Sequence, residues 1–200
     1  MAEAVVKRVL LVFAMRAEAE PLIQALGLTE DSPAKIVGPA PCVTFSGVHD
    51  GLDIHVVWNG TDKDTGVDNV GTVPAALSTY LAVMAFKPDV VISAGTSGGF
   101  KAQGASIGDV FLGSAVINHD RRIPLPNFDK YGIGYALCHA TPGQIGRVPL
   151  LCVKAVTDIV DGDRPTGEEF LENLHAAAAA LQATLPRVLS YLGGRKLAEL

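Results

Sequence analysis

The chain has 200 residues, 48% of them hydrophobic and 18% charged, with a net charge of −5 at neutral pH. This length suffices for one sizeable hydrophobic core, so we expect a single globular domain over residues 1–200. The acidic balance, with no basic cluster longer than "HDRR", argues against nucleic acid or an anionic membrane as the main partner.

Cysteine usage and the N-terminal segment bear on the compartment. Cys42, Cys138 and Cys152 are odd in number and lack metal-type spacing, which disfavours a disulfide framework or a zinc site. The apolar stretch near the N-terminus is too short for a signal peptide or a bilayer span. We therefore expect a soluble cytoplasmic protein.

The first half of the chain reads as alternating strands and helices. Residues 5–14 have the pattern of a strand covered on both faces, and residues 17–26 that of an amphipathic helix. Asp50-Gly51, between two alternating runs, predicts a β-hairpin. Helical spacing with Pro74 near the first turn predicts a helix over 67–86, and "PDVVISAG" a second buried strand.

The second half contains two further strands and a long helix. We expect strands over 109–117 and from residue 150, and a helix from Thr166 to about Leu192. Thr166 and Glu169 are spaced as a capping box, and Pro186 predicts a kink. The roughly thirty residues between 118 and 148 lack periodicity, which indicates a functional loop, a mistaken element assignment or a missing segment.

Three predicted strand ends carry polar residues: "VFAMRAEAEPL", "VISAGTSGGF" and "KAVTDIVDGD". If the strands are parallel, Glu18, Thr96 and Asp158 meet at one edge of the sheet, where α/β proteins bind ligands. The alternatives are an exposed helix-face residue for Glu18, a tight turn for "GTSGG" and a cap or turn for Asp158. Asp161 and Asp163 look like ordinary turn residues. "GTSGG" is neither a dinucleotide fingerprint nor a triphosphate-binding loop.

These motifs together resemble a known family. The chain is similar to the plant-type 5'-methylthioadenosine nucleosidases of the purine nucleoside phosphorylase superfamily in "FAMRAEAEPL", "GVHDGLDIHVV", "VGTVPAAL", "SAGTSGGF", "IGDVFL", "HDRRIP" and "KAVTDIVDGDRPTGEEFLENL". The resemblance implies a three-layer α/β/α sandwich around a mixed twisted sheet, acting as a homodimer. It also implies cleavage of the N-glycosidic bond of methylthioadenosine, and to a varying degree of S-adenosylhomocysteine, in methionine salvage. No metal or organic cofactor is implied.

The resemblance assigns roles to individual residues. Glu18 matches the carboxylate that deprotonates the attacking water, Thr96 a hydroxyl beside the sugar, and Asp158 the acid that protonates adenine at N7. General acid help of this kind contributes ~10²–10⁴ in rate, because adenine leaves poorly as an anion. The remaining predicted substrate-site residues are Met15, Gly98, Lys154 and Thr157.

One part of the family pattern is missing. Between "HATP" and "RVPLLCVKAVTD" stands only "GQIG", where the family has a strand that lines the adenine and a helix whose Met-Glu pair holds the ribose hydroxyls. We expect that one strand-helix unit of ~40–50 residues is deleted, with the junction near residues 142–147. Losing these binding groups predicts impaired or absent catalysis, and no residue is assigned to the ribose clamp.

Two alternative functions remain open. A phosphorylase of this superfamily is expected to have an arginine just before the glycine-rich loop, because a guanidinium suits a phosphate dianion. Ser93-Ala94 stands there instead, which favours hydrolysis. The second alternative is a non-catalytic isoform that dimerises with, or modulates, the full-length enzyme.

Overall fold

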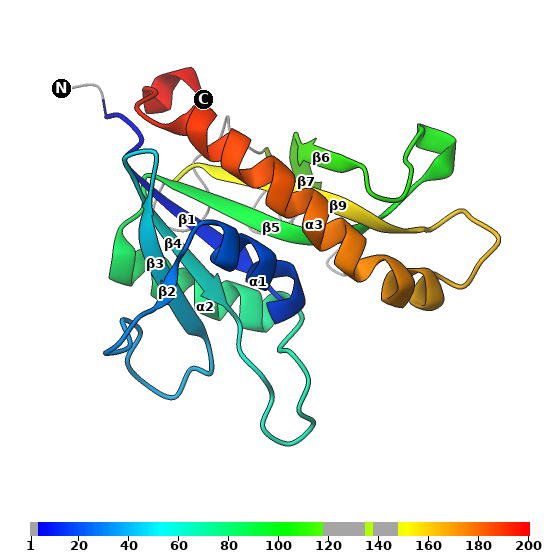
Figure 1. The fold of residues 1–200 in the computed structure, drawn as a ribbon, viewed down its shortest axis with the longest axis horizontal. Helices are drawn as coiled ribbons and strands as arrows, with labels where there is room; N and C mark the ends of the chain where they lie inside the picture. Colours follow the sequence, from blue (N-terminus) through cyan, green and yellow to red (C-terminus); the bar gives the residue numbers. More distant parts are fainter. Residues whose placement is uncertain (1–3, 118–134, 138–147) are drawn as a thin grey trace, which may run out of the picture.

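The computed structural model describes residues 4–117, 135–137 and 148–200, and its centre is a seven-stranded mixed sheet (Figure 1). The strands of this sheet, in spatial order, are β2 Thr29–Glu30, β3 Val43–His49, β4 Leu52–Trp58, β1 Arg8–Phe13, β5 Val90–Gly99, β9 Leu150–Ile159 and β6 Val110–Gly113. A separate two-stranded sheet pairs β7 Ala115–Ile117 with β8 Tyr135–Leu137. The helices are α1 Arg16–Ala25, α2 Thr72–Phe86 and α3 Thr166–Leu192, with short 3₁₀ turns at Lys101–Gln103 and Leu197–Glu199.

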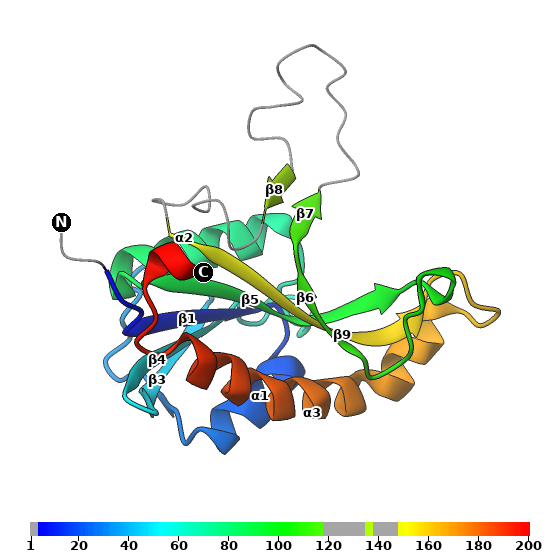
Figure 2. The same cartoon turned by 90° about the horizontal axis from the view of Figure 1, so that it is seen from above.

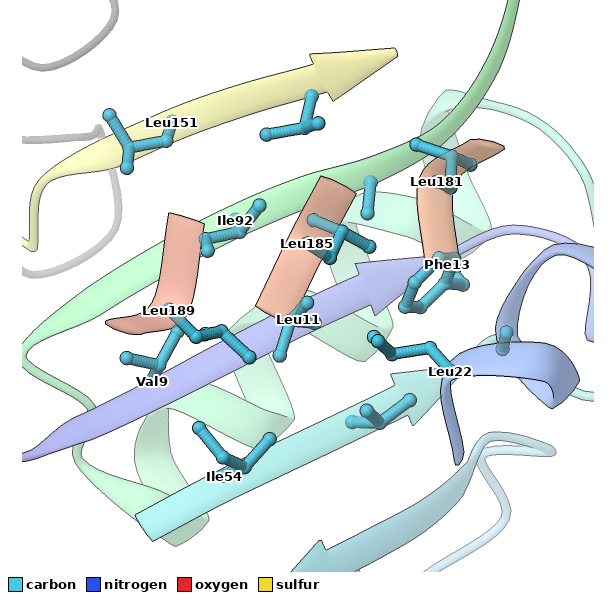
Figure 3. Close-up of a cluster of buried hydrophobic side chains, with 14 of the residues drawn as sticks. Val9, Leu11, Phe13, Leu22, Ile54, Ile92, Leu151, Leu181, Leu185 and Leu189 are labelled. Carbon is cyan, nitrogen blue, oxygen red and sulfur yellow. The ribbon is translucent and has the colours of Figure 1, made fainter. Parts of the chain in front are cut away.

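The helices cover both faces of the sheet, which gives three layers. Helices α1 and α3 lie on one face and α2 on the other (Figure 2). The larger core packs alternate β1 residues against α1 and α3, and its central members are Val9, Leu11, Phe13, Leu22, Leu181, Leu185 and Leu189 (Figure 3). The intervening β1 residues, Leu10 and Val12, pack against α2. Burial on both faces explains the continuous apolar run of β1 and confirms the predicted α/β/α sandwich.

The strand directions bring the predicted site together. Strands β4, β1, β5 and β9 are mutually parallel, whereas β3, β2 and β6 run antiparallel to their neighbours. The carboxyl ends of four adjacent strands therefore lie at the same edge of the sheet, which is the usual ligand-binding edge of such folds.

Several predicted elements are confirmed, with small shifts. The hairpin joins β3 to β4 through Asp50 and Gly51, whose φ angles of 49° and 77° are those of a tight hairpin turn. The helix predicted over 67–86 begins later, at Thr72, with Pro74 in its first turn as expected. Helix α3 ends at Leu192 and continues through Pro186.

Two predictions about the second half are wrong. Residues 109–117 form two strands instead of one, because β6 pairs with β9 and β7 turns away to pair with β8. The capping box is absent, because Pro165 occupies the cap position and Thr166 is already helical. The Glu169 carboxylate accepts a hydrogen bond from the Ile159 N–H at 2.8 Å instead, which fastens the helix start to the end of β9.

Two further points concern the limits of the described chain. The predicted deletion junction near 142–147 lies outside the described residues and stays a prediction. None of the helices in the described ranges has both the length and the apolar composition needed to cross a bilayer.

Candidate active site

Glu18 lies in the first turn of α1, directly after β1, and only 3% of it is exposed. Its Oε1 accepts hydrogen bonds from the backbone N–H and the hydroxyl of Thr96, both at 2.7 Å. Its Oε2 accepts one from the Met15 N–H at 3.2 Å. A buried charge is costly unless it is hydrogen-bonded, and these three donors satisfy the carboxylate.

Gly95 makes this close approach possible. A Cβ atom at this position would lie 3.0 Å from Glu18 Oε1, and the φ of Gly95 is +146°, a conformation that side chains disfavour. The glycine of "AGTSGG" therefore allows the end of β5 to pack directly on the Glu18 carboxylate.

A cavity of about 310 Å³ opens beside this carboxylate. Its polar lining comes from Glu18, Asn59, Ser93, Thr96 and Lys154, and its apolar lining from Val12, Ala14, Met15, Val70, Ala75, Ala94 and Phe170. Apolar walls with a few convergent polar groups are typical of small-molecule sites. A larger cavity of about 460 Å³ lies between β6 and the C-terminal half of α3, but none of the predicted site residues lines it.

Lys154 supplies a cation to the cavity. Burial lowers the pKa of its ammonium group, and the nearby Glu18 carboxylate raises it in part. An ammonium kept from water beside a carboxylate can hold a polar ligand atom between the two groups.

Asp158 lies at the end of β9, beside the end of β5. A register shift between Ser97 and Gly98 brings Gly98 opposite Asp158, and a Cβ at Gly98 would lie 2.9 Å from Asp158 Oδ2. The Thr157 hydroxyl donates to Asp158 Oδ1 at 2.7 Å. Asn173 and Glu169 of α3 bind the backbone of Thr157 and Ile159, so the helix fixes this strand end.

The structure thus divides the predicted residues into two groups. Met15, Glu18, Thr96 and Lys154 line the cavity, whereas Gly98, Thr157 and Asp158 form a neighbouring cluster outside that lining. Glu18 and Thr96 are therefore in contact, as predicted, whereas Asp158 lies at the end of the neighbouring strand β9. Within the described ranges, no three His, Cys, Asp or Glu side chains are grouped closely enough to bind a metal ion.

Sequence reasoning missed Asn59, Val70 and Phe170 as cavity residues. Asn59 had a usable signal, since it is a polar residue at the carboxyl end of a strand parallel to β1. Phe170 had none, because it belongs to the apolar stripe of α3. Asp161, interpreted as a turn residue, accepts the N–H groups of Lys101 and Ala102 at 2.6 and 2.9 Å and so joins two loops.

Comparison with known proteins identifies the family. The chain is 41% identical to the 5'-methylthioadenosine nucleosidase of Arabidopsis thaliana, over 98% of this chain and 91% of the relative. The sequence profile of the phosphorylase superfamily matches residues 8–145. The chain belongs to the phosphorylase superfamily. It is also 37% identical to a 5'-methylthioadenosine/S-adenosylhomocysteine nucleosidase of the same plant, over 98% of this chain and 95% of the relative.

A solved structure agrees with this assignment. The apo structure of the Arabidopsis thaliana 5'-methylthioadenosine nucleosidase superposes with a TM-score of 0.93 at 39% identity, over 98% of this chain and all of that chain. The sequence alignment with the 41% identical relative runs over 242 positions, whereas this chain has 200 residues. More than forty positions of the alignment therefore have no counterpart here, and the predicted strand-helix deletion stays a prediction.

Proposed function

We propose that this chain hydrolyses the N-glycosidic bond of 5'-methylthioadenosine and releases adenine. The observation that carries the proposal is the buried Glu18 carboxylate, held by Thr96 and lining a cavity of about 310 Å³. The names of the two plant relatives support this substrate. S-adenosylhomocysteine, named for the 37% identical relative, is the second substrate to assay.

The proposed reaction uses a base and an acid on opposite sides of one bond. A water molecule held by Glu18 and Lys154 attacks the anomeric carbon of the ribose and gives a proton to Glu18. The bond from that carbon to adenine N9 breaks, and the electron pair goes to the base while Asp158 donates a proton to N7. Thr96 keeps the Glu18 carboxylate in place as the ribose gains positive charge.

Water, and not phosphate, is the proposed nucleophile. Ser93 and Ala94 line the cavity at the place where a phosphorylase needs an arginine. Purified chain mixed with methylthioadenosine, with and without inorganic phosphate, tests this by chromatography of free adenine. We expect the same rate in both mixtures, and a rate proportional to phosphate concentration would assign the chain to the phosphorylases.

We further propose that two copies associate through the outer face of α2. Val73, Leu77, Tyr80 and Met84 recur at helical spacing and are 47–77% exposed, while the opposite face packs into the core through Ala82, Val83 and Phe86. A helix that is apolar on all sides is normally buried. Val70 and Ala75 line the cavity at the foot of this face, so the second copy would lie beside the site.

Solution mass tests the association. Leu77→Asp should convert a dimer into a monomer in light-scattering measurements, because it puts a charge into the apolar contact. Leu171→Asp is the matched control, since Leu171 is equally apolar and 73% exposed on another helix. A monomeric wild-type chain, or a dimer that survives Leu77→Asp, would contradict this part of the proposal.

The second candidate function is that of a non-catalytic partner. The more than forty missing positions motivate it, because the α2 face is retained while part of the relatives' length is not. Mixing this chain with the 41% identical relative and measuring mass and turnover distinguishes the two functions. A mixed dimer with altered turnover, together with no adenine release by this chain alone, would favour the partner role.

A further inference from the structure

The loop of residues 59–71 joins β4 to α2 (Figure 1), and hydrogen bonds close its base. Asn59 is 2% exposed, donates its side-chain N–H to the Asn69 carbonyl at 2.9 Å and accepts the Ser78 hydroxyl at 2.5 Å. The Asn69 N–H donates a hydrogen bond to the Gly60 carbonyl at 2.9 Å. Because Asn59 and Val70 line the cavity, the base of this loop is a wall of the proposed substrate site.

Asp68 connects this loop to the helix that carries Glu18. Its Oδ2 accepts the backbone N–H of Arg16, the first residue of α1, at 3.0 Å. Its Oδ1 accepts the indole N–H of Trp58, which is 6% exposed, at 3.1 Å. The Arg16 guanidinium lies 5.4 Å from the centre of the Trp58 ring and pairs with Glu20 at 3.1 Å. Both carboxylate oxygens of Asp68 are thus used to tie the start of α1 to the end of β4.

The first turn of α1 is therefore held at adjacent backbone groups. Asp68 accepts the N–H of residue 16, and Glu18 itself accepts the N–H of residue 15. Any shift of this turn would change the two 2.7 Å bonds between Glu18 and Thr96. Catalytic rates fall steeply when a reacting group is displaced by about 1 Å.

We propose that Asp68 is a positioning residue, which holds the first turn of α1 so that Glu18 stays in register with Thr96 and with the cavity wall. Its catalytic consequence rests on the proposed nucleosidase function. The competing interpretation is an ordinary helix cap that contributes only to global stability.

Asp68→Asn tests the proposal in the full chain, because one amide oxygen cannot replace two carboxylate oxygens as acceptors. We expect kcat for adenine release from methylthioadenosine to fall about tenfold, while KM changes by less than about twofold. Asp64→Asn makes the same charge change at an exposed position of the same loop and should leave both constants unchanged.

Amide hydrogen exchange by NMR provides a readout that does not depend on activity. The Thr96 amide, which donates to Glu18, should exchange at least about tenfold faster in Asp68→Asn, while the amide of Leu11 in the core keeps its wild-type rate. Unchanged Thr96 exchange would overturn the proposal, and an equal loss of protection at Thr96 and Leu11 would establish the helix-cap interpretation instead. If the wild-type chain releases no adenine, the proposed function fails, and Thr96 exchange still decides the role of Asp68.

Discussion

The two sides of the site differ in how their carboxylates are held. The Glu18 side consists of Met15, Glu18, Thr96 and Lys154, and the Asp158 side consists of Gly98, Thr157 and Asp158. Glu18 is almost fully buried and accepts three hydrogen bonds, one from Met15 and two from Thr96, which lies 78 residues away in the chain. Asp158 is half-buried, and among the described residues its side chain accepts a hydrogen bond from its own neighbour Thr157.

The difference follows from which parts of the chain build each side. The Glu18 side consists of β1, α1 and β5 together with one residue of β9, all of which are described and packed into the core. The Asp158 side consists of the ends of β5 and β9, fixed by hydrogen bonds to α3. The adenine platform and the ribose clamp are predicted to belong to the missing unit. We infer that water activation is more completely built than leaving-group and ribose binding in this chain.

The largest expected effect comes from the Glu18 side. Glu18→Gln keeps the size of the side chain and can accept from Thr96, but it cannot take a proton from water. We expect adenine release to fall by on the order of 10³, with little change in the affinity for methylthioadenosine. Single-turnover rates and calorimetric binding separate the two quantities. A variant that retains more than a tenth of the wild-type rate would show that Glu18 is not the base.

The Asp158 side should give the next effect. Asp158→Asn cannot donate a carboxylic proton, so we expect a loss of about 10² in adenine release with the fold unchanged. Wild type and Asp158→Asn should also be compared in a chain to which the additional positions of the 41% identical relative have been added. Asp161→Asn is the matched control, because its carboxylate accepts the N–H groups of Lys101 and Ala102 and does not line the cavity. Equal losses for Asp158→Asn and Asp161→Asn would refute the assignment of the acid.

A smaller effect, on stability, is expected at Lys154 of the Glu18 side. Burial lowers the pKa of Lys154 in the folded chain below the ordinary lysine value of 10.5. At a pH between the lowered pKa and 10.5, the folded chain therefore binds fewer protons than the unfolded chain. The free energy of unfolding should therefore rise with pH in this window. Lys154→Met should be more thermostable than wild type at pH 7, and this advantage should shrink as the pH approaches 10.5, although adenine release is lost in part.

Thermal unfolding of wild type, Lys154→Met and the exposed control Lys63→Met at pH 7 and pH 10 measures this effect. If the difference in Tm between wild type and Lys154→Met is the same at both pH values, the cost of burying the charged ammonium group does not cause it.

The sequence predicted features that depend on local periodicity or on strand ends. The apolar run of β1, the Asp50-Gly51 hairpin and the contact of Glu18 with Thr96 all follow from short stretches combined with parallel strand order. Features that depend on the choice of a distant partner were not predictable in this way. Asp68 binds a residue 52 positions away, and the pattern of 109–117 does not reveal that β6 and β7 have different partners.

Hydrolysis of methylthioadenosine in water enriched in ¹⁸O tests the central proposal most directly. We predict that the purified wild-type chain releases adenine and a methylthioribose that carries one ¹⁸O atom by mass spectrometry, and that Glu18→Gln yields neither above background. Absence of free adenine from the wild-type chain, a phosphorylated sugar as the product, or equal ¹⁸O incorporation by Glu18→Gln would contradict it.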